Sequence, residues 1–204
     1  MPDVCETEER LRGLLDGGAR YALAFSGGCD SALLLALLVR CGYDVVPYTA
    51  VTAFQMPFEL DDARDAAAAL GLSPRLVEVD VLSDAAICAN PDNRCYLCKR
   101  LMFSRVFEAM ARDGRGDAAL LDGTNATDDP ARRPGMRALG EMGVVSPLRA
   151  LGLSKDDVRS LSHRLGLLTA RKPSFSCLAT RVPAGEGICA DSLARAAGGV
   201  EGWR

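Results

Sequence analysis

The sequence predicts an α/β fold, a parallel β-sheet with helices on both faces. Three observations support this fold class. Short apolar runs of strand length alternate with longer helical segments that end at glycine. A loop of small residues, Ser26–Ser31, separates the first apolar run, Tyr21–Phe25, from the apolar helix Ala32–Arg40. The 204 residues, 49% hydrophobic and 25% charged, suffice for one such domain with a modest extra segment.

The first half of the chain is expected to alternate helix and strand. Residues 6–18 form a leading helix, and the strand 21–25 and the helix 32–40 follow, with Gly42 as a left-handed stop. The run 44–52 is rich in β-branched residues and predicts a second strand. An acidic-to-alanine helix at 58–70 ends before Gly71, and the apolar/polar alternation of 75–81 predicts a third strand.

The second half continues the alternation with longer loops. Asn90-Pro91 marks a turn within a predicted loop at 83–94. The remaining strands are expected at 118–121 and 144–145. The remaining helices are expected at 95–112, 154–165 (with Ser154 and Asp157 as a capping box) and 191–197. Loops are expected at 126–137 and at 172–188, the latter an active-site loop, and 198–204 is predicted to be weakly structured.

The loop Ser26–Ser31 reads Ser-Gly-Gly-Cys-Asp-Ser and has the chemistry of an anion site. A strand, a glycine loop and a helix in this order aim backbone N–H groups and the positive end of the helix dipole at one point. Gly27 and Gly28 are expected to take positive φ and let a phosphate approach closely, while the two serines add hydroxyl donors. Asp30 would repel a bare phosphate and is therefore expected to act through a bound Mg²⁺.

The residue pattern of this loop excludes two phosphate-binding motifs and resembles a third. Without Gly-Lys-Ser/Thr it is not a Walker loop, and without G-x-G-x-x-G it is not the dinucleotide fingerprint. It resembles the PP-loop of the ATP pyrophosphatases, which cleave ATP between the α- and β-phosphates and hold the departing pyrophosphate. The resemblance implies an adenine nucleotide alpha hydrolase-like (HUP-type) fold with ATP and Mg²⁺ as cofactors. A tight strand–helix turn without a ligand is disfavoured because both serines and the aspartate are present.

The net charge, the N-terminal residues and the length of the apolar runs limit which partners and which cellular compartment are expected. The net charge is −3 and the pI about 5.3, whereas a protein that holds nucleic acid through its phosphates usually carries a basic surface. The charged N-terminus lacks the apolar region of a signal peptide. The longest apolar run, Ala32–Val39, is far shorter than the roughly 20 residues of a membrane span. A cytoplasmic protein without nucleic-acid or membrane partners is expected, with its eight cysteines free, catalytic or metal-bound.

Three cysteines stand in a pattern typical of catalysis or metal binding. Cys95 and Cys98 form a C-x₂-C at the start of a helix, and Cys177 lies in the predicted active-site loop. Cationic neighbours surround all three and favour the thiolate form. Cys5, Cys41 and Cys189 are interpreted as ordinary small apolar residues, and Cys29 as a tolerated loop residue.

A metal at these cysteines is more readily an iron–sulfur cluster than zinc. Structural zinc usually takes four protein ligands, but the chain has a single histidine, His163, and no second C-x₂-C. Three cysteines with a vacant fourth corner fit a [4Fe–4S] cluster better. Cys88 is left open as a fourth ligand for either metal.

The phosphate loop combined with these cysteine segments resembles the LarE family. Its members are ATP-dependent sulfur transferases that help build the nickel-pincer nucleotide cofactor of lactate racemase. The matching pieces lie between residue 20 and about residue 193. They are Phe25–Ser31, Asn90-Pro91, Arg94–Lys99, Gly123–Asn125, Arg133–Gly135, Glu141, Ser146–Leu148, Lys155, Lys172–Ser174 and Cys177–Arg181.

The resemblance implies a two-step reaction. A carboxylate of pyridinium-3,5-biscarboxylic acid mononucleotide attacks the α-phosphate of ATP, pyrophosphate leaves, and a sulfur nucleophile then displaces AMP to give a thiocarboxylate. Some members take the sulfur from one sacrificial cysteine, which Cys177 matches. Others hold a [4Fe–4S] cluster on three cysteines and deliver a cluster-bound sulfide, and Cys95 and Cys98 match the two additional ligands. Both sulfur sources are left open here.

The resemblance also implies roles for the residues of the matching segments. The binding of pyrophosphate and Mg²⁺ is assigned to Ser26, Gly27, Gly28, Asp30 and Ser31. Contact with the nucleotide or the substrate is assigned to Gly123, Thr124 and Asn125. The role of stabilising negative charge on the substrate or on the transferring adenylyl group is assigned to Lys99, Arg133, Lys172 and Arg181.

Three other functions remain open. A PP-loop tRNA thiolase with a three-cysteine cluster would share the chemistry but should bring a basic RNA-binding surface. An ammonia-using PP-loop synthetase would leave the three cysteines without a role. A non-catalytic nucleotide-binding or Fe–S protein would bind ATP without releasing pyrophosphate above background.

The domain division follows from the same resemblance. Residues 1–170 are expected to form the PP-loop ATP pyrophosphatase domain. Residues 171–204 are expected to hold the active-site cysteine loop and the start of a truncated C-terminal region, because members of the family continue into a region used for oligomerisation and for part of the site. The expected partner is a small-molecule nucleotide, and a homo-oligomer is left open.

Overall fold

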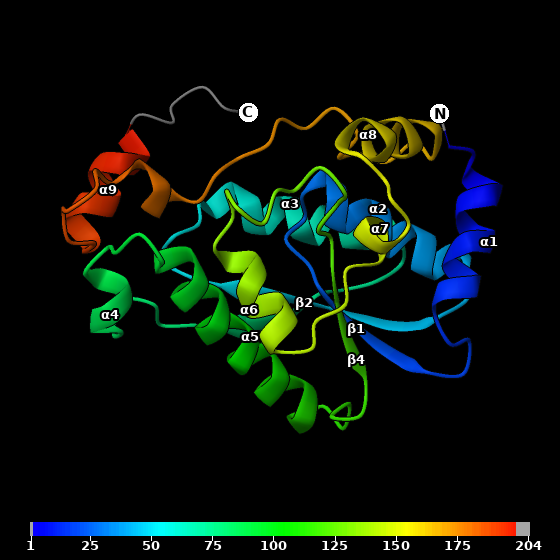
Figure 1. Cartoon of the computed structure of the whole chain (residues 1–204), viewed down its shortest axis with the longest axis horizontal. Helices are drawn as coiled ribbons and strands as arrows, with labels where there is room; N and C mark the ends of the chain where they lie inside the picture. Colours follow the sequence, from blue (N-terminus) through cyan, green and yellow to red (C-terminus); the bar gives the residue numbers. More distant parts are fainter. Residues whose placement is uncertain (1, 199–204) are drawn as a thin grey trace.

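The computed structural model describes residues 2–198, which form a four-stranded sheet between two layers of helices (Figure 1). The strand order is β3-β2-β1-β4, and all three pairings are parallel. The strands are β1 (Arg20–Ala24), β2 (Asp44–Val51), β3 (Arg75–Glu78) and β4 (Ala119–Asp122). In the central strand, Ala24 pairs with Tyr48 of β2 and with Asp122 of β4. The carboxyl ends of these strands therefore meet at one edge, where ligands bind in such sheets.

Helices cover both faces of the sheet, and Figure 1 shows α2 and α3 on one side with α5 and α6 on the other. The elements are α1 (Val4–Leu14), α2 (Cys29–Arg40), α3 (Pro57–Ala68), α4 (Ala85–Cys88), α5 (Arg94–Arg112), α6 (Gly135–Glu141), α7 (Pro147–Ala150), α8 (Lys155–Arg164), the 3₁₀ helix η1 (Leu178–Arg181) and α9 (Ala190–Gly198). The predicted fold class, a parallel sheet with helices on both faces, is confirmed.

Alternating side chains of the strands feed two separate cores. Tyr21 and Leu23 of β1 pack into one core with α2 and α8, whereas Ala22 packs into the other with α5 and η1. In β4, Leu121 belongs to the first core and Leu120 to the second. This alternation is the period-two pattern of a strand buried on both faces. We call these the α2-side core and the α5-side core.

Several predicted element boundaries were wrong for local reasons. The leading helix spans α1 rather than 6–18, because Asp3 caps its start and Leu15 is already extended. The predicted loop 83–94 contains α4, which Asp84 caps and whose Ile87 is fully buried. The predicted strand at 144–145 is a single bridge between Leu121 and Val145. Helices of four residues such as α4 and α7 are too short to show a helical period in the sequence.

The remaining predicted loops also change. The predicted loop 126–137 runs into α6, and the predicted loop 172–188 contains η1. Helix α8 begins at the predicted capping box, in which the Asp157 N–H donates to Ser154 Oγ and the Ser154 N–H to Asp157 Oδ2. Of the segment predicted to be weakly structured, Gly198 ends α9, and residues 199–204 lie outside the described residues.

Helix α2 starts earlier than predicted. Cys29, Asp30 and Ser31 form its first turn, and Gly28 is the N-cap. Gly27 takes the expected positive φ of 69°, but Gly28 does not, because its φ is −78° and its backbone is extended. The phosphate loop is therefore a shorter turn that places the carboxylate of Asp30 on the helix itself.

No helix within residues 2–198 combines the length and the apolarity needed to cross a bilayer. This agrees with the short apolar runs of the sequence.

Candidate active site

The phosphate loop lies between β1 and α2 and is pinned against α3. A Cβ atom at Gly27 would lie 2.5 Å from Ala63 Cα and 2.7 Å from Ala63 N, so only glycine fits. The two serines face each other, with 3.2 Å between Ser26 Oγ and Ser31 Oγ. The Gly28 N–H donates to Ser26 Oγ at 3.3 Å. The loop thus gathers two hydroxyls and a backbone N–H at the start of a helix, as an anion site requires.

The turn after β4 touches this loop from the neighbouring strand. A Cβ atom at Gly123 would lie 2.8 Å from Ser31 N, so the two turns are in backbone contact. The buried carboxylate of Asp122 fixes the turn by accepting hydrogen bonds from Thr124 Oγ1 at 2.5 Å and from Ser146 Oγ at 2.6 Å. The predicted residues 123–125 therefore lie beside the predicted phosphate loop.

Asp30 is the residue at which three distant segments meet. Its Oδ1 accepts a hydrogen bond from Asn125 Nδ2 at 3.1 Å, and its Oδ2 lies 2.5 Å from Lys155 Nζ. Lys155 begins α8 and was not among the predicted site residues. The structure adds it as a cation at the loop, where it neutralises Asp30.

Two adjoining cavities open at this edge of the sheet, with volumes of about 330 and 470 Å³. Ser26, Asp30, Asp128 and Arg133 line both. The smaller cavity has an apolar end, made by Phe25, Tyr48, Ala50, Met102, Phe103 and Val106. The larger is more polar and includes Glu59, Asn125, Thr127, Lys155 and Lys172. An apolar end and a polar end that meet at a phosphate loop suit a nucleotide.

The four predicted cations occupy different places. Lys99 lines the smaller cavity, and its Nζ lies 5.5 Å from the centre of the Phe103 ring. Burial lowers the pKa of Lys99, which Asp122 partly opposes. Arg133 lines both cavities, and its Nη1 lies 2.8 Å from Asp128 Oδ1.

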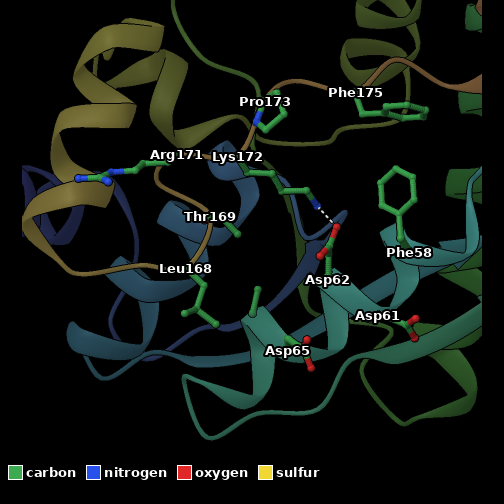
Figure 2. A pocket seen from close by; sticks show the side chains of 11 residues that line it. Phe58, Asp61, Asp62, Asp65, Leu168, Thr169, Arg171, Lys172, Pro173 and Phe175 are labelled. Carbon is green, nitrogen blue, oxygen red and sulfur yellow. Dashed lines mark ion pairs between the residues drawn. The ribbon is translucent and has the colours of Figure 1, made fainter. Parts of the chain in front are cut away.

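Lys172 and Arg181 are placed less directly. Lys172 lines the larger cavity but pairs with Asp62 of α3, and Figure 2 shows its side chain pointing to that carboxylate. The pair lies in a third cavity, of about 600 Å³, between α3 and the segment 168–175. The Arg181 guanidinium lies 5.2 Å from the centre of the Phe175 ring, and Arg181 lines none of these three cavities.

The three predicted cysteines come together from two segments. Cys95 and Cys98 lie in the first turns of α5, and Cys177 is the N-cap of η1. The Leu178 N–H donates to Phe54 O at 2.9 Å and ties η1 to the segment after β2. All three are free thiols and half-buried, and each of Cys95 and Cys177 raises the pKa of Cys98. Cys88 lies on α4, and its charge interaction among the cysteines is with Cys189 rather than with these three.

The expectation that cationic neighbours make these cysteines thiolates was wrong for two of them. The pKa of Cys98 is raised to about 12, first by burial and then by Cys177 and Cys95, against the weaker effects of Arg94 and Lys99. Burial also raises the pKa of Cys177. Within residues 2–198, no three His, Cys, Asp or Glu side chains stand in a ready arrangement for a metal ion. The donor set, three thiols without histidine, is nevertheless the kind that Fe–S clusters take.

Alkylation of Cys98 is expected to depend steeply on pH. Because its thiol keeps a proton at neutral pH, its rate with iodoacetamide should rise roughly tenfold per pH unit from pH 8 to 11. The unfolded chain loses this proton first, so Cys98 should also lower the free energy of unfolding as the pH rises from 9 towards 12. Peptide mapping of metal-free Cys95→Ala protein follows this one thiol, and a rate that levels off below pH 9 would contradict the raised pKa.

The PP-loop class is defined by a parallel sheet whose first strand leads through a Ser-Gly-Gly loop into a helix. This chain has that arrangement, and two cavities open at the loop. The fold is shared with an NMN synthetase from Francisella tularensis, with a TM-score of 0.67 at 16% identity over 85% of this chain and 76% of that one.

Proteins of similar sequence show which family within the PP-loop class the chain belongs to. The chain is 37% identical to an uncharacterised protein of Synechocystis sp. over 188 residues, which cover 92% of this chain and 69% of the relative. It is 36% identical to the pyridinium-3,5-bisthiocarboxylic acid mononucleotide synthase of Lactiplantibacillus plantarum, over 86% of this chain and 64% of that enzyme. The chain belongs to the LarE family of PP-loop sulfur transferases. No family model matches the sequence.

Proposed function

We propose that this chain uses ATP to adenylylate a carboxylate of pyridinium-3,5-biscarboxylic acid mononucleotide and converts the product to a thiocarboxylate. The observation that carries the proposal is the course of the segment 172–177. Lys172 and Phe175 line the larger cavity, and Cys177 follows two residues later beside Cys98. An acyl-adenylate formed in the cavity would then lie near the one sulfur-bearing side chain of this segment, Cys177. Kinship with the L. plantarum synthase, of which the chain spans 64%, supports the same substrate.

ATP is proposed to lie across the two cavities. The adenine would contact the apolar end of the smaller cavity, where Phe25, Tyr48 and Phe103 lie. The β- and γ-phosphates would accept hydrogen bonds from the loop N–H groups and from Ser26 and Ser31. Mg²⁺ would be held by Asp30, whose carboxylate faces the larger cavity. Lys155, now paired with Asp30, is close enough to add its charge to the pyrophosphate.

The first step needs positive charge at the α-phosphate. A substrate carboxylate oxygen attacks that phosphorus, the bond to the bridging oxygen of the β-phosphate breaks, and pyrophosphate leaves. Lys99 and Arg133 line the cavity where charge would develop on the α-phosphate oxygens. Fixed cations in a partly buried site stabilise such charge more than they would in water.

The second step needs a sulfur nucleophile at the acyl carbon. Cys95, Cys98 and Cys177 are the residues that would hold a [4Fe–4S] cluster, and such a cluster would supply the sulfide. In either sulfur route, AMP leaves from the acyl carbon. The segment that carries Cys177 therefore has to stay close to the cavity throughout.

Two measurements test this proposal. The substrate mononucleotide, but not bulk tRNA, should stimulate isotope exchange between ATP and pyrophosphate; stimulation by tRNA alone would favour a tRNA thiolase instead. Protein purified without oxygen should contain about four irons per chain, with both iron and sulfide lost in Cys95→Ala. An iron-free active protein whose Cys177 loses the mass of H₂S on turnover would point to the sacrificial route. Exchange without any acceptor-dependent stimulation would overturn the proposal.

The expected setting belongs to the same proposal. We propose a small-molecule nucleotide as the partner, without nucleic acid or membrane, and a cytoplasmic enzyme. Assembly into a homo-oligomer and the division at residue 170 stay predictions.

A further inference from the structure

The segment that follows η1 is docked onto the turn between α4 and α5. Asn90 Nδ2 donates to Pro183 O and to Glu186 O, each at 3.0 Å. The Ile188 N–H donates to Cys88 O at 2.7 Å. Asn90 is only 9% exposed and has a φ of 54°, the single positive value of a non-glycine residue among the described residues. Three hydrogen bonds thus hold residues 183–188 against residues 88–90.

This docking brings Cys189 next to Cys88. The 2.7 Å hydrogen bond puts the two segments in backbone contact at the residue before Cys189, and the charge of Cys189 adds to burial in raising the pKa of Cys88. A disulfide needs Cα atoms about 4.4–6.8 Å apart. Cys189 directly follows the docked Ile188. It is exposed, whereas Cys88 is half-buried with its thiol directed at Leu82 O, 3.3 Å from Sγ. The sequence pattern pointed to Cys88 only as an open fourth ligand, and Cys189, expected to be an ordinary small apolar residue, is exposed.

The two thiols differ in reactivity in the way that an attacking and a resolving cysteine differ. Hydrogen bonds from Ser192 lower the pKa of Cys189, which lies at the start of α9. Burial raises the pKa of Cys88, and Asp84 and Asp80 raise it further. The exposed thiol is therefore the better nucleophile at neutral pH.

We propose that Cys88 and Cys189 are a second dithiol site, which forms a disulfide by exchange with a small-molecule disulfide such as oxidised glutathione. The Cys189 thiolate attacks one sulfur of the oxidant, forms a mixed disulfide and releases one small thiolate. The Cys88 thiol then loses its proton and attacks Cys189 Sγ, releasing the second small thiol. Counted from the dithiol, the protein loses two electrons and two protons, and the small disulfide takes them up to become two thiols.

The disulfide would tie α4 to the start of α9 and fix the segment that begins at Cys177. The bridge closes a loop of about 100 residues, and the restriction of the unfolded chain grows with the length of the closed loop. It would do so without using Cys95, Cys98 or Cys177.

Peptide mapping under non-reducing conditions tests the pairing directly. Trypsin separates the cysteines: peptide 76–94 contains Cys88 alone, peptide 182–195 contains Cys189 alone, and Cys177 lies in 172–181. Metal-free, full-length protein treated with oxidised glutathione should yield 76–94 linked to 182–195 as the main cross-linked species. The oxidised protein should also melt at a higher temperature than the reduced protein.

The variants separate the two thiols. Cys88→Ser should stop at one glutathione on Cys189, Cys189→Ser should leave Cys88 unmodified, and both should lose the rise in melting temperature. Cys5→Ser, which removes another exposed thiol, should behave like the parent protein. A stable glutathione adduct on Cys189 of the parent protein, or linkage of 172–181 to 95–99 alone, would overturn the pairing. Because no ATP or substrate is used, the result is independent of the proposed function.

Discussion

Gly27→Ala is expected to lower the affinity for ATP at least about 100-fold and to cost roughly 2–4 kcal/mol of unfolding free energy. The new Cβ would lie 2.5 Å from Ala63 Cα, a backbone atom of a fully buried helical residue. Either the loop or α3 must then move. The residue would also have to hold a φ of 69°, which L side chains rarely adopt. Calorimetric titration with a non-hydrolysable ATP analogue and urea unfolding measure the two effects.

Gly42→Ala is the matched control for backbone strain. Its φ of 82° is also left-handed, but nothing lies within 4 Å of the added Cβ. It should cost only about 1 kcal/mol and leave ATP affinity unchanged. If Gly27→Ala bound the analogue as tightly as Gly42→Ala, the loop would not be the phosphate site.

Cys177→Ala is expected to separate the two steps of the proposed reaction. Thiocarboxylate formation should fall at least about 1,000-fold, because either sulfur route uses this thiol. Substrate-dependent exchange between ATP and pyrophosphate should change less than about twofold, since Cys177 lines neither nucleotide cavity. Mass spectrometry of the product and isotope exchange are the two readouts.

Cys41→Ala is the control for the loss of a half-buried thiol, because Cys41 lies at the far end of α2. It should retain both activities. Equal loss of exchange and sulfur transfer in Cys177→Ala would mean that the residue supports adenylation. An unchanged product yield would remove Cys177 from the chemistry.

Structural elements whose sequence signals lie within a few adjacent residues could be predicted from the sequence. The strand, the glycine turn and the helix around Gly27 are adjacent in the chain, so periodicity and turn residues identify them. The same holds for Ser154 and Asp157, whose capping box spans four residues. The start of α2 was missed because Cys29, Asp30 and Ser31 suit either a loop or a first helical turn.

Contacts between distant segments could not be predicted in this way. Lys155 reaches Asp30 across 125 residues, and no local pattern gives their distance. Lys172 lines the larger cavity, but its pairing with Asp62 of α3, 110 residues earlier in the chain, follows from no local pattern. The titration of Cys98 was missed for the same reason, because burial by the tertiary fold outweighs its cationic neighbours. Only the alignment of β1, β2 and β4 decides which of these groups share a cavity.

The two cores on either side of the sheet support different parts of the site. The phosphate loop and Cys29 rest on the α2-side core, while Cys98 and Cys177 pack against the α5-side core. Side chains of one core can change without repacking the other, because the sheet lies between them. The α2-side core beneath the phosphate loop can therefore vary without moving the three thiols. The reverse does not hold, because Tyr48, Phe103 and Val106 of the α5-side core also line the apolar end of the smaller cavity. A change of sulfur chemistry on the α5 side is thus constrained by the proposed adenine site, which shares its core.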